Sequence, residues 1–298
     1  MSSATSLRPP SSPAAVLLRP GRPADAAECG RICFEAFKAI SDRHHFPPDF
    51  PSAEAATGLM AMLFSHPTIY SVVAEQEGRV VGSNFLWHHG PIAGVGPITV
   101  EVAAQNGSIG RRLVEDVLAF AETWRSTGVR LVQAGYHGRS LSLYTKLGFE
   151  VREPLACLQG AVPRVTVPGR HVRPATQADV AACSVLCRAV HGHDRRAELA
   201  EAVALGGAMV VEHGGQLSGY CTSIGFFGHA VGRDPDDLKA LIAGAKEIQG
   251  PGFLLPTRQS ELFRWCLAHG LRVVQPLTLM SRGFYHEPTG AFLPSILF

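Results

Sequence analysis

The chain has 298 residues, of which 46% are hydrophobic and 17% are charged, so it can bury a core and is not expected to be disordered as a whole. At about 150 residues a domain, this length suggests two domains. Its 27 basic and 25 acidic side chains leave a net charge of +2, which argues against a dedicated nucleic-acid binder. No apolar stretch is long enough to cross a membrane, so no membrane partner is expected.

The seven cysteines are scattered and form no closely spaced CxxC pair. This usage indicates buried thiols in a reducing compartment, so we expect a cytoplasmic protein. Residues 1–15 are rich in Ser, Pro and Ala and lack the apolar centre of a signal peptide. We predict a disordered tail there, with a transit peptide as the alternative.

Two segments of the chain open alike. Three residues recur at one constant offset: Arg19 as Arg173, Asp25 as Asp179, and Cys29 as Cys183. Each segment predicts a short strand, a turn and an amphipathic helix with an Asp in its first turn. We therefore expect a first domain over residues 16–160, a linker over 161–170 and a second domain over 171–298.

The remaining elements follow a similar order in both halves. The first half predicts a helix, a strand pair, a β-rich stretch, a long helix, a strand and a short helix, over residues 52–65, 69–76 with 79–88, 94–102, 107–125, 129–133 and 141–147. The second half predicts a helix, a strand pair, a helix, a strand, a helix and a strand, over residues 194–204, 208–212 with 216–224, 236–246, 252–255, 260–269 and 271–283. These elements predict an α/β fold (α+β mixed sheet): two tandem domains, each a mostly antiparallel mixed sheet flanked by helices.

Residues 95–113 run from a strand through a glycine-containing turn into a helix. The first N–H groups of a helix have no partner within it and, together with the helix dipole, they favour an anion such as phosphate. Gly107, Ser108 and Gly110 are small enough for pyrophosphate to approach the backbone, and Arg111 and Arg112 add positive charge. The alternative is an ordinary turn between a strand and a helix.

The string AQNGSIGRRL, residues 104–113, resembles the acetyl-CoA loop of the GNAT superfamily of N-acetyltransferases, whose pattern is Gln/Arg-x-x-Gly-x-Gly/Ala. Gln105 matches the first position and Gly110 the last, while Ser108 stands where the middle glycine usually lies. The resemblance implies acetyl-CoA as co-substrate and no metal. Besides Gln105, it implies that the pyrophosphate is held by the backbone of Asn106, Gly107, Ser108, Ile109, Gly110 and Arg111. It further implies that the pantetheine arm pairs like a strand with Ile98, Thr99 and Val100.

Residues 140–150, SLSLYTKLGFE, resemble a second GNAT signature, which ends in Leu-Tyr-x-Lys-Leu-Gly-Phe. The order and spacing of the two motifs make the pair more specific than either alone. In the family this tyrosine protonates the leaving thiolate of CoA, and the resemblance gives that catalytic role to Tyr144. A phenol with a pKa of about 10 keeps its proton at neutral pH. The alternative is that Tyr144 only packs its helix.

The group that takes a proton from the acceptor amine is left open. Many members of the family use a carboxylate early on the strand before the loop, and residues 92–96 contain none. The candidates are His88, His89 and Glu101, with water equally open, because imidazole titrates near neutral pH and a carboxylate can accept a proton.

The second half lacks the loop. Residues 228–237, GHAVGRDPDD, replace it with acidic side chains at a helix start, which would repel pyrophosphate. Phe263 is expected in the place of Tyr144, so this half resembles a degenerate GNAT copy. We expect it to close the acceptor pocket or cover the first domain, with Phe226, Phe227 and Trp265 in the core.

Together the motifs predict an acetyl-CoA-dependent N-acetyltransferase. The acyl group would pass to the amine of a small molecule or amino-acid-like acceptor by direct attack in a ternary complex. The alternatives are a non-catalytic CoA-binding sensor and a peptide or protein N-acetyltransferase. No nucleic-acid partner is expected, and the chain is expected to be a monomer or homodimer.

Overall fold

The computed structural model describes residues 15–88 and 90–297, so most of the tail predicted over 1–15 lies outside the described residues. The elements of the first half are β1 (Val16–Pro20), a 3-10 turn (Pro23–Asp25), α1 (Ala26–His44), α2 (Ala53–Ser65), β2 (Ile69–Gln76), β3 (Arg79–Trp87), β4 (Ile92–Val95), β5 (Thr99–Val100), a 3-10 turn (Val102–Ala104), α3 (Ile109–Thr123), β6 (Gly128–Ala134), α4 (Gly138–Lys146) and β7 (Glu150–Gln159). The β-rich stretch predicted over 94–102 forms two short strands, because the chain turns at Gly96 and Pro97 and a proline cannot donate to a strand ladder.

The second half repeats much of this order. Its elements are β8 (Arg170–Pro174), a 3-10 turn (Gln177–Asp179), α5 (Val180–His191), α6 (Arg196–Ala204), β9 (Met209–His213), β10 (Gln216–Cys221), β11 (Ala230–Gly232), α7 (Pro235–Gly244), β12 (Phe253–Pro256), α8 (Ser260–Ala268), β13 (Arg272–Gly283) and β14 (Ala291–Leu293). The sequence did not predict β11 and β14, because three residues are too few to show an alternating pattern.

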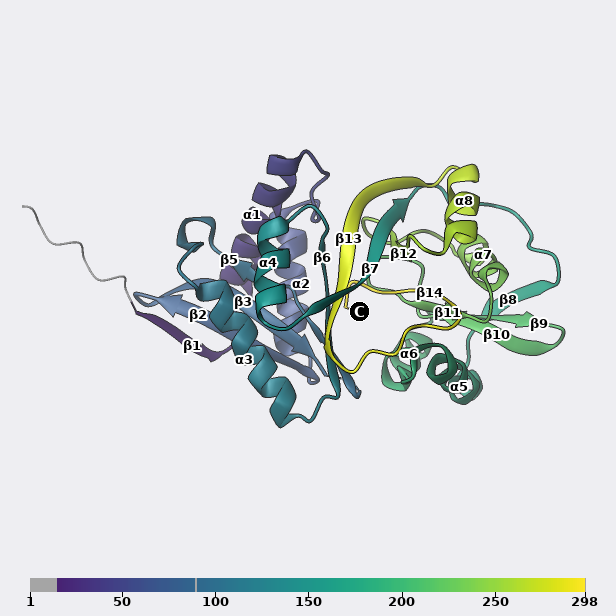
Figure 1. The fold of residues 1–298 in the computed structure, drawn as a ribbon, viewed down its shortest axis with the longest axis horizontal. Helices are drawn as coiled ribbons and strands as arrows, with labels where there is room; N and C mark the ends of the chain where they lie inside the picture. The colour runs from purple at the N-terminus through teal and green to yellow at the C-terminus, as the bar shows by residue number, and fades with distance from the viewer. Residues whose placement is uncertain (1–14, 89, 298) are drawn as a thin grey trace, which may run out of the picture.

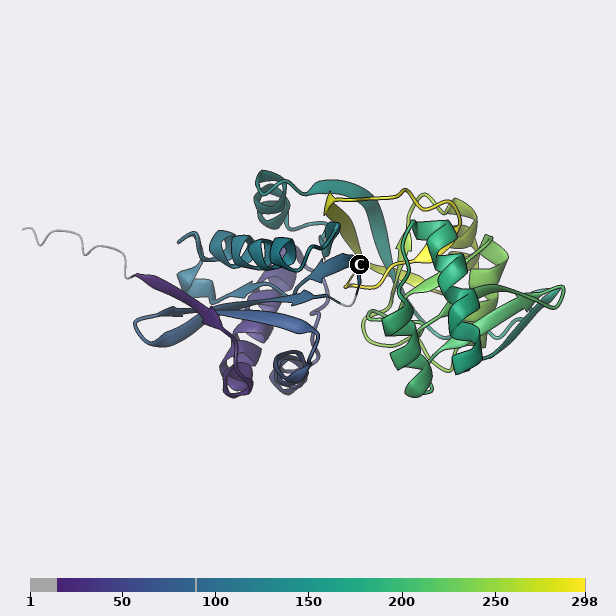
Figure 2. The same ribbon diagram turned by 90° about the horizontal axis from the view of Figure 1, so that it is seen from below.

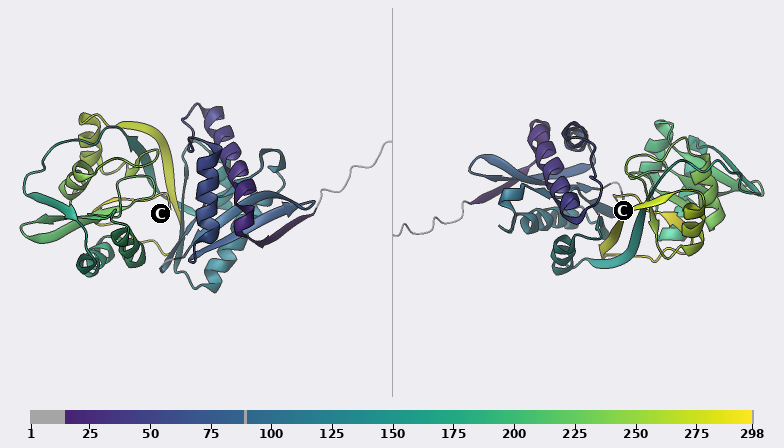
Figure 3. Two further views of the ribbon diagram at one scale, coloured as in Figure 1. Left: turned by 180° about the vertical axis from the view of Figure 1, so that it is seen from behind. Right: turned by 90° about the horizontal axis from the view of Figure 1, so that it is seen from above.

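The described strands form two sheets. The larger has the order β1-β2-β3-β4-β6-β13-β7-β12, and β5 also pairs with β3. Helices α1 and α2 cover one face of its first half, and α3 and α4 cover the other (Figures 1 and 3). The smaller sheet, β14-β11-β10-β9-β8, lies between α5 with α6 and α7 with α8 (Figure 1). The predicted fold class, a mixed α/β fold with helices on both faces, is confirmed.

Helix α3 illustrates how the sequence produces this packing. Its buried positions include Ile109, Leu113 and Val117, which recur every four residues and so share one face. That face packs with β-strand residues such as Val72 and Leu131 in one core cluster. Removing these side chains from water drives the helix onto the sheet and fixes where its first turn lies.

Strand β13 comes from the second half and lies in the sheet of the first half. It pairs antiparallel with β6 on one side and with β7 on the other, and β7 pairs in turn with β12. The two halves therefore share one continuous sheet, with β13 shown in yellow at the junction (Figures 1 and 2). The sequence predicted the strand but not its place, because local patterns do not encode which strand is the partner.

The recurring residues of the two openings form the same cluster twice. Arg19 donates to both carboxylate oxygens of Asp25 and to Glu75, each at 2.8 Å. The second half repeats these contacts with its own three residues: Arg173, Asp179 and Glu212. Each cluster ties the first strand of its half to the next strand and to the first helix, so the recurrence has a structural explanation.

The cysteines take the predicted place in the core: all seven are free thiols and buried. Burial raises the pKa of the Cys29 thiol to about 12, which makes it inert at neutral pH. Within residues 15–88 and 90–297, no helix has the length and apolar character needed to cross a membrane.

Candidate active site

The larger sheet opens where β4 ends. Strands β4 and β6 pair over only three residues, 92–94 of β4, and the chain then leaves β6 so that β5 pairs with β3. A cavity of about 1300 Å³ lies at this divergence, and its wall includes both separating segments, residues 95–100 and 131–134. Because small-ligand pockets usually hold about 300–1,000 Å³, this one has room for two reactants.

The predicted phosphate turn forms one wall of the cavity at the start of α3. Ser108 is the N-cap residue, and its hydroxyl makes no hydrogen bond to the helix amides. Both Asn106 (φ 76°) and Ser108 (φ 62°) have left-handed backbone conformations. The first amides of α3 have no carbonyl partners within the helix, so a phosphate could accept from them.

Most of the residues predicted to bind the cofactor line this cavity. All but Gly107 are on its wall: Ile98, Thr99, Val100, Gln105, Asn106, Ser108, Ile109, Gly110 and Arg111. A Cβ atom at Gly110 would meet only ordinary contacts, with Leu143 at 3.7 Å and Val100 at 3.8 Å. Packing within the protein therefore does not require glycine there, whereas a bound pyrophosphate would.

Basic side chains also belong to the cavity wall, but Arg112 does not, because it donates to the Val16 carbonyl at 2.8 Å. Arg111, Arg139 and Lys146 all contribute to the wall. Gln105 braces the turn, because its Nε2 donates to the carbonyl of Val100 at 3.1 Å and its Oε1 accepts from Arg139 at 3.2 Å. These three cations suit the cavity to a polyanionic ligand.

Tyr144 reaches the cavity wall from α4, with 8% of its surface exposed. Burial raises the pKa of the Tyr144 phenol to about 12, and a hydrogen bond with Ser140 opposes that shift. The phenol therefore carries its proton at neutral pH, as a general acid must. Its ring packs edge-on against Phe149, with centroids 6.1 Å apart.

Two further polar residues of the cavity wall, His137 and Ser140, were not singled out in the sequence. Ser140 Oγ lies 2.7 Å from Nδ1 of His137, which is the N-cap residue of α4. Burial lowers the pKa of His137 to about 4, so its ring is neutral at neutral pH. Ser140 precedes Tyr144 by one helical turn, and that spacing was the available signal.

The described base candidates do not lie on the cavity wall. The Glu101 carboxylate pairs with Arg31 of α1 at 3.0 Å. His88 packs against Trp124, with ring centroids 4.4 Å apart, and burial lowers the pKa of its imidazole. His89 lies outside the described residues.

The second half supplies part of the wall. Phe226 and Phe227 line the cavity, and 48% of the Phe227 surface is exposed, so the expectation that Phe227 belongs to the core is wrong. The sequence of two adjacent aromatics gives no local sign of which one is buried and which one is exposed. Trp265 is half-buried and packs against the core cluster of the second half, as expected.

The second half places Cys266, and not Phe263, where the first half has Tyr144. Helices α4 and α8 have nine residues each, and each is followed by a left-handed glycine, Gly148 (φ 85°) and Gly270 (φ 84°). The Tyr144 carbonyl accepts the N–H five residues later at 3.0 Å, and the Cys266 carbonyl does the same at 3.1 Å. The prediction was wrong because it matched the pair Leu262 and Phe263 with Leu143 and Tyr144. The glycine that ends each helix fixes which positions of the two helices are equivalent.

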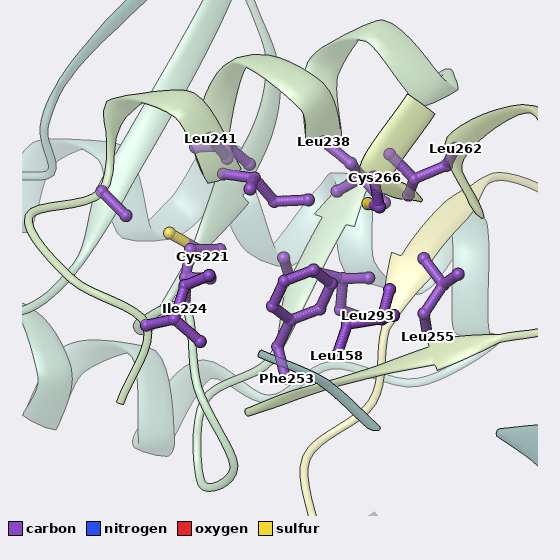
Figure 4. Close-up of a cluster of buried hydrophobic side chains, with 14 of the residues drawn as sticks. Leu158, Cys221, Ile224, Leu238, Leu241, Phe253, Leu255, Leu262, Cys266 and Leu293 are labelled. Atoms are coloured by element: carbon purple, nitrogen blue, oxygen red, sulfur yellow. The ribbon is translucent and has the colours of Figure 1, made fainter. Parts of the chain in front are cut away.

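Figure 4 shows Cys266 in the buried cluster with Leu238 and Leu262. The thiol is fully buried, and burial raises its pKa to about 12. Such a thiol is not available to a ligand, and the degenerate character of the second half stays a prediction.

Asp49, in the loop between α1 and α2, is a cavity residue that the sequence did not signal. It is the only carboxylate on the wall within the described part of the chain. Its partner is Gln275 of β13, whose Nε2 donates to Oδ1 at 3.2 Å. Among residues 15–88 and 90–297 no group of three or more His, Cys, Asp or Glu side chains could hold a metal ion.

Comparisons with known proteins agree with the motifs. Residues 67–151 match the family model of the acetyltransferase (GNAT) domain, and both sequence motifs lie within this range. No curated protein matches the chain. A proposed acetyltransferase from Pyrococcus horikoshii aligns over 100% of this chain and 98% of its own, with a TM-score of 0.72 and 16% identity.

A GCN5-related N-acetyltransferase from Sphaerobacter thermophilus aligns over 91% of this chain and 96% of its own, with a TM-score of 0.59 and 13% identity. At these identities the likeness establishes the fold alone. Both alignments extend over the two halves, so the whole architecture occurs in other proteins.

Proposed function

We propose that this chain is an acetyl-CoA-dependent N-acetyltransferase of the GNAT type for a small-molecule or amino-acid-like amine. The observation that carries the proposal is the start of α3. The Ser108 hydroxyl makes no cap hydrogen bond there, and this helix start lines the same cavity as Tyr144. A site for phosphate and a protonated phenol on one wall are what thioester aminolysis needs.

The coenzyme would lie with its pyrophosphate on the amides of residues 106–111, beside Arg111, Arg139 and Lys146. Strand β5 pairs with β3 alone among the described strands. Its second edge is therefore available to the amide groups of pantetheine, which can bind as an added strand does.

The reaction follows from these positions. The amine nitrogen attacks the thioester carbonyl, a C–N bond forms and the C–S bond breaks. An acceptor that arrives as an ammonium ion loses two protons, of which one ends on the coenzyme sulfur and the other passes to solvent. Tyr144 supplies the proton for the departing thiolate and regains one from solvent, so the enzyme is unchanged.

The second half supports a small acceptor over a protein. Phe226, Phe227 and Ile296 contribute to the wall and so narrow the space in which a long chain would have to lie. The matched geometry of the two halves also supports a tandem duplication whose second copy has lost the coenzyme site.

The test combines calorimetry with coenzyme A and a thiol-release assay with acetyl-CoA and a panel of primary amines. We expect micromolar binding and amine-dependent release of free thiol. Absence of coenzyme binding would overturn the proposal. Binding without turnover of any amine or peptide would instead favour the non-catalytic CoA sensor, and turnover of peptides alone would favour a peptide acetyltransferase.

A further inference from the structure

The charged side chains on the cavity wall come from different segments of the chain. Arg111, Arg139 and Lys146 accompany the start of α3 and helix α4, whereas Asp49 comes from the loop between α1 and α2. Within the described part of the chain, Asp49 is the only acidic residue on the wall. A polyanionic coenzyme satisfies the cations, but the carboxylate needs a ligand of opposite charge.

Asp49 is held in place without a cation. Gln275 donates to Oδ1 and accepts at its own Oε1 from the hydroxyl of Tyr136 at 3.1 Å. Gln275 is 2% exposed, so the side chain that links Asp49 to Tyr136 is shielded from water. No Lys, Arg or His of the described residues pairs with Asp49. Burial raises the pKa of its carboxyl, and the Gln275 hydrogen bond opposes that shift.

The surroundings of Asp49 are apolar and aromatic. Phe37 of α1 and Phe50 of the same loop pack edge to face, with centroids 5.7 Å apart, and both line the cavity. Phe226 and Phe227 line it from the second half. Asp49 is half-buried, and a carboxylate withdrawn from water in such a place is costly unless a cationic group pairs with it.

We infer that Asp49 binds the ammonium group of the acceptor, and that the acceptor is a primary amine with an apolar, aromatic-sized body packed against the phenylalanines. This inference rests on the proposed function and names its substrate class. The second half then contributes to specificity through Gln275, which orients the carboxylate, and through Phe226 and Phe227, which hold the body of the amine.

The test measures binding of three ligands of similar shape and different charge: 2-phenylethylamine, 2-phenylethanol and phenylacetate. Calorimetry at neutral pH, with and without coenzyme A, should show the amine binding about 10- to 100-fold more tightly than the alcohol, because hydrogen bonds to charged groups are worth that factor. Phenylacetate should bind more weakly than the alcohol. Asp49→Asn keeps the shape of the side chain, and in this variant the affinity for the amine should fall to the affinity for the alcohol.

Asp42→Asn is the matched control, because Asp42 lies on α1, pairs with Lys38 on the surface and is not on the cavity wall. It should keep the preference for the amine. Equal binding of the amine and the alcohol to the unaltered protein would overturn the inference, whether or not the Asp49 variant folds. A preserved preference in Asp49→Asn would also overturn it.

Coenzyme A titrated into the same samples separates this inference from the proposed function. Coenzyme binding without a preference for the amine would overturn the Asp49 assignment alone. A preference for the amine without coenzyme binding would overturn the acetyltransferase proposal alone.

Discussion

The two halves enter their long helices in different ways. In the first half β5 pairs with β3 at Gly82, and residues 101–108 lead from there to α3. In the second half β11 pairs with β10 at Gly219, and only residues 233–234 lead to α7. The two glycines are equivalent, because a Cβ atom would lie 2.7 Å from a neighbouring carbonyl oxygen at Gly82 and 2.9 Å at Gly219.

In the second half, a carboxylate of the short connection itself occupies the start of α7. The Asp234 carboxylate accepts from the N–H groups of Asp236 at 2.9 Å and Asp237 at 3.1 Å. Arg170 pairs with Asp234 at 2.6 Å and with Asp237 at 2.8 Å. At α3 the N-cap side chain makes no such bond. The difference teaches that a helix start is open to an external phosphate only where no carboxylate of the chain already occupies it.

The largest effect is expected from Gly110→Glu. This variant puts a carboxylate at the start of α3, as the second half has one at the start of α7. The Cβ atom fits the protein, but the carboxylate would enter the proposed pyrophosphate site. We expect coenzyme A affinity, measured by calorimetry, to fall more than about 100-fold through lost contacts and repulsion. Gly58→Glu, at an exposed position of α2 where a Cβ meets nothing within 4 Å, is the control. Unchanged affinity in Gly110→Glu would refute the phosphate site.

The next largest effect concerns the two short helices. Tyr144→Phe keeps the packing against Phe149 and removes only the hydroxyl, so kcat should fall about 100-fold while coenzyme affinity stays within a factor of two or so. Cys266→Ala at the equivalent position should leave kcat unchanged and lower the free energy of unfolding by about 1 kcal/mol. Full turnover in Tyr144→Phe would remove the acid role, and a kcat loss in Cys266→Ala would contradict the assigned difference.

The sequence predicted what is local and missed what is distant. The spacing of Ile109, Leu113 and Val117 was enough to predict α3, and the motif of residues 104–113 was enough to predict the turn that lines the cavity. Asp49 could not be predicted, because its partner Gln275 is 226 positions away in the sequence. The site depends on the place of β13 in the first sheet, and strand pairing of that kind has no local signature.

A smaller effect is expected from removing the Asp234 carboxylate, which caps the start of α7. Asp234→Ala loses the helix cap and one ion pair with Arg170, so urea unfolding should show a loss of about 1–2 kcal/mol. Coenzyme A affinity should not change, since this helix start is outside the cavity. Asp236→Ala is the matched control, because its exposed carboxylate pairs with Lys239 and does not cap. Equal stability of the two variants would count against the cap.

The smallest expected effect comes from Ser108→Gly, at the residue where the first half departs from the GNAT loop pattern. Ser108 has a φ of 62°, which costs an L-residue energy that glycine does not pay. The variant should gain about 0.5–1 kcal/mol in urea unfolding and keep its coenzyme A affinity, because the site uses backbone amides and not the hydroxyl. Ser142→Gly, within α4, should lose a similar amount, since glycine is unfavourable in a helix interior. If Ser108→Gly instead weakened coenzyme binding about tenfold, we would conclude that the Ser108 hydroxyl contacts the phosphate. The difference between α3 and α7 would then depend on this side chain and not on uncapped backbone amides alone.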